Sequence, residues 1–373
     1  QGHQGHAARY AGQESRYADL RAEYPGGALR ENYRQRQAYA TAGAALTRGR
    51  VEGALAVDYG HDVLASNLAD AGRVRRDALL QSLSLRGRFF GRRPLTLTLR
   101  GLAHLCVEQP PAGQRRLYRR LTPALTAVWR AVERPHAALA LRASAQELFR
   151  LPSFTEAYYR HLGDTGLRPE LTRQAAAGLT LQLGRRAGDA AGLWELSVDA
   201  YAARVDDKIV SVPYNLFVWR TVNLGRVSAT GLDASLEGRQ PLGRHLVLRL
   251  AASYALRHAA DRTAPGTPGY GRALPYAPRH TGNVAVACEH PWLSVSAGVA
   301  CSGGRWASVE HLPSTRLPAY AEANFALWRS FTMGHVRLDV RADLLNAFDE
   351  QYEVVRRYPM PGRSYRLGVK AVW

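Results

Sequence analysis

This 373-residue sequence has no long hydrophobic run. Purely apolar stretches extend over only a few residues, whereas a helix that spans a membrane needs roughly 20. Any crossing of a membrane would therefore use strands, and these must close into a barrel so that every backbone polar group is satisfied. Hydrophobic residues still make up 46% of the chain, which is enough to bury a sizeable surface and excludes a disordered polymer.

Cysteines are also scarce and show no useful spacing. Cys106, Cys288 and Cys301 form no CxxC motif, and three cysteines cannot all pair in disulfides, so neither a metal site nor a disulfide framework is indicated. We interpret them as small apolar side chains. The sequence begins without methionine or a secretory signal, and we expect it to be an internal or C-terminal piece of a longer precursor.

Lysine is nearly absent although the formal net charge is +19. Only Lys208 and Lys370 are lysines, so arginine supplies 48 of the 50 basic residues. Such a bias, together with abundant alanine and glycine, is typical of a GC-rich genome. The arginines alternate with apolar residues and do not gather in one block, so we do not expect a nucleic-acid partner.

What the sequence does contain is strict alternation, most clearly in its last ten residues, 364–373. Tyr365, Leu367, Val369, Ala371 and Trp373 fall on one side of the predicted strand, and Arg366, Gly368 and Lys370 on the other. Successive side chains of a strand point to opposite faces, so one face is suited to an apolar environment and the other to water.

The same alternation recurs along most of the chain, for example over 336–344. Its charged positions are Arg337, Asp339, Arg341 and Asp343. Four charges on one face cannot lie in a dry core unless each is paired, but the water-filled lumen of a large barrel would accommodate them. About fifteen segments of roughly ten residues show this pattern, which is the length of a tilted transmembrane strand. We therefore predict an all-β fold, an antiparallel transmembrane β-barrel.

The predicted connections alternate in length, as the turns and outer loops of membrane barrels do. Residues 240–243 and 289–292 form short links, whereas 257–280 and 303–318 form long polar ones. Residues 1–36 are polar and show no alternation. We expect them to be a loop or the frayed start of a fragment, followed by barrel strands over 37–373.

Seven segments in the second half of the chain form a series in a fixed order. These are Phe149–Tyr159 (compare FRxPTFxELYY), Gly163–Glu170 (GNxxLxPE), Asp199–Ile209 (xAYYxxxxDxI), Asn223–Asp233 (NxGxxxxxGxE), Pro275–His280 (xPxxPxH), Leu344–Tyr352 (NLFDxxY) and Pro361–Tyr365 (PGRxY). In this order they resemble the C-terminal barrel of TonB-dependent outer-membrane receptors. Phe154 is expected beyond a strand end, at the membrane interface, and Asn346, Asp349 and Gly362 suit turns.

The resemblance implies a complete protein with an N-terminal plug domain inside a barrel of 22 strands and a segment that contacts TonB. Neither the plug nor that segment is recognisable here, and about fifteen strands fall short of 22, so we expect a fragment of the barrel. Arg337, Asp339, Arg341 and Asp343 would face the lumen and the plug. By resemblance, Trp373 would be the terminal aromatic signal read by the barrel-assembly machinery, a position usually held by phenylalanine.

The function implied by the resemblance is TonB-dependent uptake of a scarce nutrient, such as cobalamin or a ferric siderophore, across the outer membrane of a Gram-negative bacterium. Residues 205–213, 219–225 and 351–362 look most like cobalamin-receptor-like members from Bacteroidetes-type bacteria, and haem stays open as a ligand. The implied partners are the TonB complex, outer-membrane lipid and lipopolysaccharide, the barrel-assembly machinery, a small nutrient chelate and a surface lipoprotein.

Three alternatives remain at this point. A passive porin would share the alternation and the charged lumen but would have neither plug nor TonB coupling. A soluble β-sandwich would share only the alternation. An enzyme is not expected, because no GxSxG or comparable nucleophile motif appears and the twelve histidines are scattered, and no cofactor is predicted.

Overall fold

The computed structural model describes residues 2–19, 29–67, 72–160, 162–184, 192–213 and 219–373. Among these residues, sixteen strands follow one another in one antiparallel sheet, in the order β1-β2-β3-β4-β5-β6-β7-β8-β9-β10-β11-β12-β13-β16-β17-β20. The predicted all-β, antiparallel class is confirmed, with sixteen strands in the sheet where about fifteen were expected. The chain divides into two compact units, Gln1–Ala127 with Ser144–Arg173 and Val205–Leu224, and Val128–Ala143 with Gln174–Arg204 and Gly225–Trp373.

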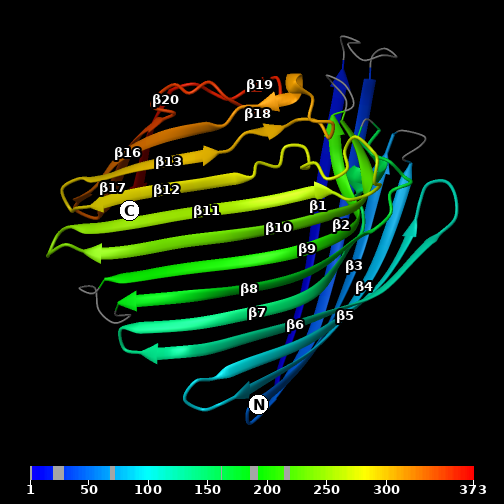
Figure 1. Ribbon diagram of the computed structural model, residues 1–373, viewed down its shortest axis with the longest axis horizontal. Coiled ribbons are helices and arrows are strands. Elements are labelled where there is room, and N and C mark those ends of the chain that lie inside the picture. The colour runs from blue at the N-terminus through cyan, green and yellow to red at the C-terminus, as the bar shows by residue number, and fades with distance from the viewer. Residues whose placement is uncertain (1, 20–28, 68–71, 161, 185–191, 214–218) are drawn as a thin grey trace. The chain divides into compact units, whose positions relative to one another are not determined.

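The first unit contains the strands at the start of the chain and the one α-helix described. Its complete elements are β1 (Gly2–Asp19), β2 (Leu29–Arg48), β3 (Val51–Ser66), β4 (Arg73–Phe89), β5 (Leu95–Gln109) and α1 (Phe154–Tyr158). Figure 1 shows β2 to β5 side by side, in blue to cyan. Gly49 closes the β2–β3 turn with a φ of 61°, a conformation that glycine adopts without steric cost.

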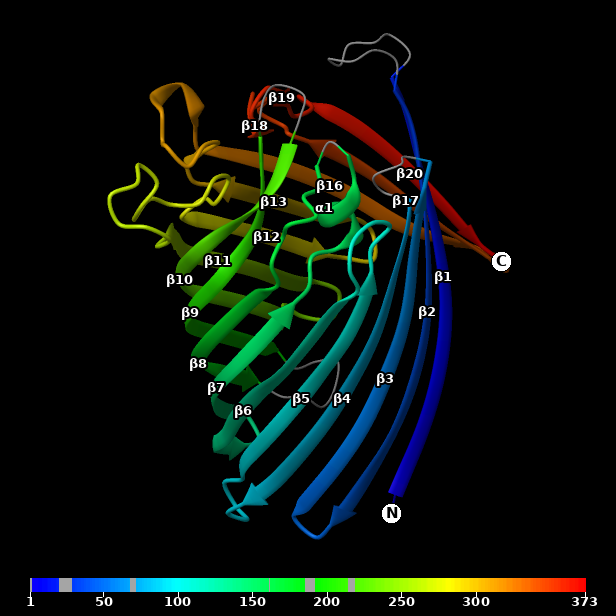
Figure 2. The ribbon, with the colours of Figure 1, turned by 90° about the vertical axis from the view of Figure 1, so that its right-hand side faces the viewer.

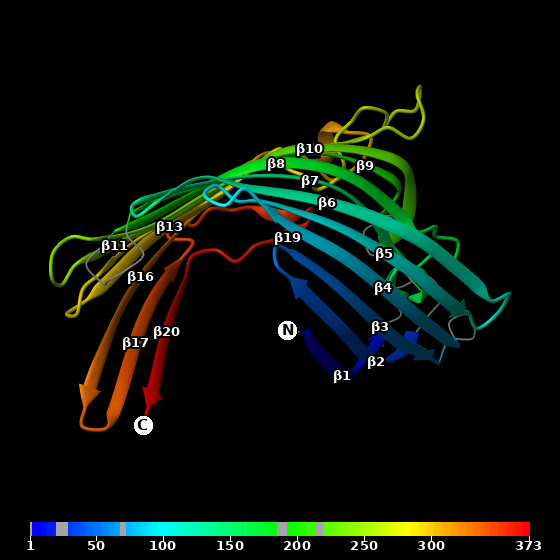
Figure 3. The same cartoon turned by 90° about the horizontal axis from the view of Figure 1, so that it is seen from below.

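The second unit contains the strands at the end of the chain. Its complete elements are β11 (Val247–Asp261), β12 (His280–Glu289), β13 (Ser294–Ser302), β14 (Arg305–Trp306), η1 (Pro313–Thr315), β15 (Arg316–Leu317), β16 (Tyr320–Met333), β17 (Val336–Leu345), β18 (Glu353–Val355), β19 (Tyr358–Pro359) and β20 (Ser364–Val372). β14 pairs with β15 and β18 with β19, each as a small separate ribbon. Figure 3 shows β16, β17 and β20 side by side, in orange to red.

Five strands contribute residues to both units. They are β6 (Arg116–Arg134), β7 (Ala137–Arg150), β8 (Glu170–Gly184), β9 (Leu193–Pro213) and β10 (Trp219–Pro241). The strand bounds show the predicted contrast in connection length in this part of the sheet, since residues 290–293 link β12 to β13 whereas 262–279 link β11 to β12.

The prediction for residues 1–36 is wrong where the structure describes them. Gly2–Asp19 forms β1, and its register with β2 runs without a break from Gly2 opposite Leu46 to Asp19 opposite Leu29. A β-ladder is built from backbone groups, so it forms without apolar alternation, and the polar sequence of this segment concealed it. Residues 1 and 20–28 lie outside the described residues.

Candidate functional site

The four charged residues predicted to face the lumen lie on one face of β17 and form ion pairs along it. Arg337 Nε donates to Asp339 Oδ1 at 2.9 Å, and Arg341 Nε donates to Asp343 Oδ1 at 2.7 Å. The Ser330 hydroxyl, on β16, also donates to Asp339 at 2.5 Å. Each carboxylate therefore has a guanidinium partner two residues earlier on the same face.

The ladder continues onto β20, because Asp343 lies opposite Arg366 and Asp339 opposite Lys370. Arg366 Nε donates to Asp343 Oδ2 at 3.0 Å, so Asp343 holds two guanidiniums and is only 7% exposed. The guanidinium of Arg341 also lies 5.6 Å from the centre of the Trp328 ring. Asp343 is thus the centre of the ladder, whereas Asp339 is at its more exposed end.

The opposite face of the same three strands is apolar and exposed. In register, Phe325 lies beside Leu344 and Tyr365, and Leu327 beside Ala342 and Leu367. The exposed apolar side chains of this face are Phe325, Leu327, Phe331, Met333, Tyr365, Leu367, Val369 and Trp373. Soluble proteins usually expose apolar side chains singly, whereas here they form one continuous surface. A continuous apolar surface is the arrangement expected of a lipid-facing wall. Trp373 is 92% exposed, at the end of this face.

Charged side chains elsewhere in the second unit are paired in the same way. Arg142 donates to both carboxylate oxygens of Asp199, and Gln182 Nε2 donates to Glu195 Oε2 at 2.6 Å. Arg249 Nε donates to Glu289 Oε1 at 2.6 Å. Glu195 and Asp199, four residues apart on β9, are therefore held by different partners, Gln182 on the adjacent β8 and Arg142 on β7.

In the first unit, the segment after β7 forms α1 and packs on one face of the sheet. Ser153 is the N-cap residue, and its hydroxyl accepts from the Glu156 N–H at 3.2 Å while its own N–H donates to Glu156 Oε2 at 2.8 Å. Burial alone would raise the pKa of Glu156, but the bonds from Ser153 and Arg150 outweigh it and lower the pKa. Figure 2 shows α1, in green, beside the ends of the blue strands.

The expectation that Phe154 would lie at a membrane interface is wrong. Phe154 is buried in a cluster with Tyr33, Leu64, Val74 and Tyr158, and the guanidinium of Arg76 lies 4.7 Å from the centre of its ring. The helix turns the aromatic side chain onto the sheet, which buries its apolar area and adds a cation–π contact.

A buried carboxylate, Glu108 on β5, joins this helix to the sheet. The Tyr158 hydroxyl donates to Glu108 Oε1 at 2.6 Å, and Arg76 Nε donates to Glu108 Oε2 at 2.8 Å. Burial and the bond to Glu108 raise the pKa of Tyr158. Sequence reasoning missed Glu108, whose partners are 32 and 50 residues away in the chain.

A second buried carboxylate, Glu170, ends the segment that follows α1. It accepts from Lys208 Nζ at 3.1 Å, from Arg150 Nη2 at 3.3 Å and from the Ile209 N–H at 3.0 Å. Three donors compensate for the burial of its charge. Glu170 is the last residue of the Gly163–Glu170 segment singled out in the sequence, and its bonds join β7, β8 and β9.

The long connections of the second unit form a set of ordered loops. Asp261 ends β11 by accepting from the Thr263 N–H at 2.8 Å, and the Tyr276 N–H donates to the Trp306 carbonyl at 2.7 Å. The His311 ring stacks on Trp306 with centroids 4.9 Å apart, and its Nε2 lies 2.9 Å from the Ala273 carbonyl. These contacts join the β11–β12 loop to the β13–β16 loop.

The β17–β20 loop is attached to the same set. Arg305 Nη2 donates to the carbonyls of Glu353 and Val354 at 2.6 and 3.1 Å. Tyr352 stacks on Tyr320 at 4.0 Å and donates to Glu322, and burial with this bond raises the pKa of Tyr352 to about 12. As predicted, Asn346 and Asp349 occupy turn positions, with φ values of 47° and 56°.

These loops are basic and aromatic. Arg262, Arg272 and Arg279 are exposed in 262–279, a stretch that has no carboxylate, and Arg262 lies 5.5 Å from the centre of the Tyr270 ring. Groups of three or more histidine, cysteine, aspartate or glutamate side chains able to hold a metal are absent from the described residues. No helix in that part of the chain is long and apolar enough to span a membrane. The exposed arginines of 262–279 can form charge-assisted hydrogen bonds to an anion.

Comparisons with known proteins agree with this architecture. A family model described as "TonB dependent receptor-like, beta-barrel" matches residues 82–347. None of the curated proteins matches. Similar solved structures include the copper transporter OprC (TM-score 0.72, 14% identity over 98% of this chain and 62% of that one) and the unliganded ferric citrate transporter FecA (0.67, 14%, 100% and 59%). The FrpB iron transporter of Neisseria meningitidis is also similar (0.71, 14%, 98% and 61%). The chain spans about three fifths of the length of these structures.

Proposed function

The chain belongs to the family of TonB dependent receptor-like β-barrels, and we propose that it is the C-terminal barrel portion of an outer-membrane receptor that takes up a small metal chelate. The observation that carries the proposal is the division of β16, β17 and β20 into an exposed apolar face and a face of paired charges. That division is suited to a wall between lipid and water.

The ligand that the loops favour is an anionic chelate. Arginine forks bind carboxylate and catecholate-like oxygens in pairs, and the exposed aromatic rings offer flat apolar contacts. A ferric siderophore or a ferric carboxylate combines both features. Cobalamin, which the resemblance of residues 205–213 implies, is the second ligand to be tested.

In the complete receptor, we propose that the ligand binds at the long loops and passes the barrel when TonB pulls on the plug. Arg337, Asp339, Arg341 and Asp343 would face the lumen and contact the plug as well as stabilise the wall. Lipopolysaccharide would surround the outer rim, the barrel-assembly machinery would read Trp373, and a surface lipoprotein would cover the loops.

The test is uptake and binding by the full-length receptor. We expect radiolabelled ferric siderophore uptake that requires TonB and a proton-motive force, and saturable binding that weakens at least about tenfold in the double variant Arg262→Gln, Arg279→Gln. A matched control is Arg92→Gln, Arg93→Gln, which removes the same charge from the short turn between β4 and β5. Equal weakening in both variants would argue against a loop site.

The passive porin gives a different result in the same cells. Its flux would rise linearly with solute concentration and would persist without TonB. Uptake of that kind, with no saturable binding of any chelate, would replace the receptor proposal by the porin.

A further inference from the structure

The sheet of the first unit has two distinct faces. One face carries α1 and its buried cluster, with Tyr33, Leu64 and Val74 pointing toward the helix. The other carries an apolar band, whose exposed members are Val51, Leu55, Tyr59, Leu83, Leu85, Phe89, Leu99 and Leu105. In register, Leu55 lies opposite Leu83, and Leu85 opposite Leu99.

The apolar band has the height of a membrane core. On β4 it runs from Leu79 to Phe89, ten residue steps or about 33 Å along the strand. A strand tilt of about 40° reduces this to about 25 Å, the height of the lipid-facing band of outer-membrane barrels. Tyr59 ends the band on β3, and its hydroxyl donates to Asp77 Oδ1 at 2.7 Å, the position expected for an interfacial aromatic.

Beyond Tyr59 and one row that holds Ala38, His61 and Asp77, the same face becomes basic. The register places Arg36 opposite Val63 and Val63 opposite Arg75, and the next row holds Arg34, Ala65 and Arg73. We call Arg34, Arg36, Arg73 and Arg75 the arginine patch. Their positions all have the parity of the apolar band, so they lie on its face and not on the face that carries α1.

The patch lies at the end of the strands that bears the long connections. Residues 67–72 and 151–169 connect strands at this end, whereas the turns at 49–50 and 90–94 close the opposite end. In barrels of this type the long connections are outermost, so the patch is at the level of the outer leaflet.

Arg36, Arg73 and Arg75 are exposed, and no ion pair is found for them in the part of the chain that the structure describes. Asp77, the carboxylate of β4 that shares this face, is already bonded to Tyr59 and to His61 Nδ1, each at 2.7 Å. Arg34 has a partner and lies opposite Glu14 in register, so the argument rests on the other three.

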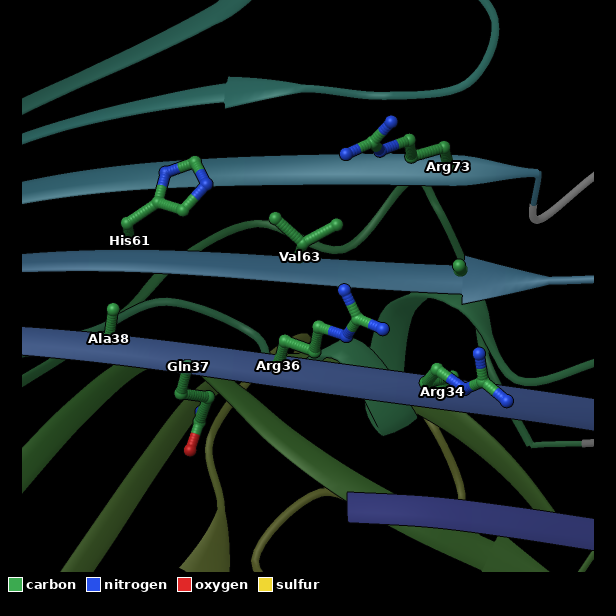
Figure 4. A pocket seen from close by; sticks show the side chains of 8 residues that line it. Arg34, Arg36, Gln37, Ala38, His61, Val63 and Arg73 are labelled. Carbon is green, nitrogen blue, oxygen red and sulfur yellow. The ribbon is translucent and has the colours of Figure 1, made fainter. Parts of the chain in front are cut away.

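Arg34, Arg36 and Arg73 line a surface hollow of about 470 Å³. Figure 4 shows Arg34, Arg36 and Arg73 around it, with Val63 between them and His61 at its edge. Arginines two strands apart are about 10 Å from each other at Cα, and rows two residues apart about 7 Å. Long side chains can converge across such distances on one or two phosphate groups.

We propose that the arginine patch binds the phosphate groups of the outer-leaflet glycolipid, lipopolysaccharide. A free phosphate would use only the patch, whereas a phosphorylated lipid would also lay its acyl chains on the apolar band immediately below. The continuity of band and patch on one face therefore favours the lipid. This inference rests on the proposed outer-membrane location and is independent of the nutrient that the receptor binds.

The experiment compares two triple variants of the full-length receptor. Arg36→Gln, Arg73→Gln, Arg75→Gln removes the patch, and Arg50→Gln, Arg92→Gln, Arg93→Gln removes three exposed arginines from the turns at the opposite end of the same strands. Each protein is stripped of lipid in detergent and titrated with purified lipopolysaccharide, its dephosphorylated form and inorganic phosphate, with native mass spectrometry as the readout.

We expect the patch variant to bind lipopolysaccharide at least about tenfold more weakly than the parent, and the control variant to change less than about twofold. The parent should bind dephosphorylated lipopolysaccharide at least about tenfold more weakly than it binds the phosphorylated form. Equal binding by parent and patch variant overturns the proposal, as does equal binding of the dephosphorylated lipid.

Two further arms keep the test decisive. Folding of the patch variant is judged by heat-modifiable gel mobility. If it does not fold, the variant Arg36→Lys, Arg73→Lys, Arg75→Lys, which keeps the charge, takes its place and should bind lipopolysaccharide with intermediate affinity. An affinity equal to that of the parent would argue against a guanidinium site. Saturation by inorganic phosphate as tight as by the lipid would refute a lipid site. If the full-length receptor binds lipopolysaccharide through the patch but binds no metal chelate, the proposed nutrient function is refuted and the lipid site is not.

Discussion

The two aspartates of the β17 ladder make a matched pair for testing how the wall is stabilised. Asp343 accepts from Arg341 and Arg366, and its side chain is 6% exposed, whereas Asp339 accepts from Arg337 and Ser330 and is 33% exposed. A charge-assisted bond contributes about 1.5–3 kcal/mol when shielded. Both guanidiniums that bind Asp343 are more than half exposed, so water reduces each contribution to about 1 kcal/mol.

We therefore expect Asp343→Asn to lower the free energy of unfolding by about 2 kcal/mol and Asp339→Asn to lower it clearly less. The measurement is urea unfolding of the full-length receptor in lipid vesicles, followed by tryptophan fluorescence. A double-mutant cycle of Asp343→Asn with Arg366→Gln should show coupling. Equal losses for the two aspartates, or additive effects in the cycle, would refute the assignment of Asp343 as the centre of the ladder.

Three other predictions concern the helix, a close contact and the C-terminus. Because the pKa of Glu156 is lowered in the folded state, its bonds stabilise the fold above the carboxylate's unfolded pKa and are lost as the pH falls through the lower, folded pKa. Glu156→Gln should therefore lower the free energy of unfolding by about 1 kcal/mol at pH 7 and by progressively less in acid. The same change at the exposed Glu133 should show no such pH dependence. Gly163→Ala should cost about 1–3 kcal/mol in denaturant unfolding, because its Cβ would lie 2.8 Å from backbone atoms of α1, while Gly53→Ala, in open space, should be neutral. Trp373→Ser should slow membrane assembly in pulse-chase experiments without lowering the melting temperature of assembled protein, and Trp373→Phe should restore the rate, since this exposed side chain has little packing to lose.

The sequence predicted the strands wherever apolar residues alternate, and it failed where the determining contact is local or distant in the chain. β17 and β20 were predicted because their two faces differ in polarity at every step. α1 was missed although its signal was present: Ser153 and Glu156 have the spacing of a capping box, and the five-residue helix is too short to show a 3.6-residue period. Glu108 and Glu170 could not have been assigned, because their partners come together only through the pairing of strands far apart in the sequence.

The formal charge of +19 illustrates the same distinction between composition and placement. Arg341 and Arg366 both pair with one aspartate, Arg76 pairs with a buried glutamate, and Arg142 pairs with Asp199. Arg36, Arg73 and Arg75 gain their significance only from the register of β2, β3 and β4, which places residues separated by up to 39 positions on one face. A uniform excess of arginine would confer general attraction to anions. In this chain, many arginines are paired along the strands, and Arg36, Arg73 and Arg75 are left exposed beyond an apolar band. This placement favours ligands that present an anionic group together with an apolar surface.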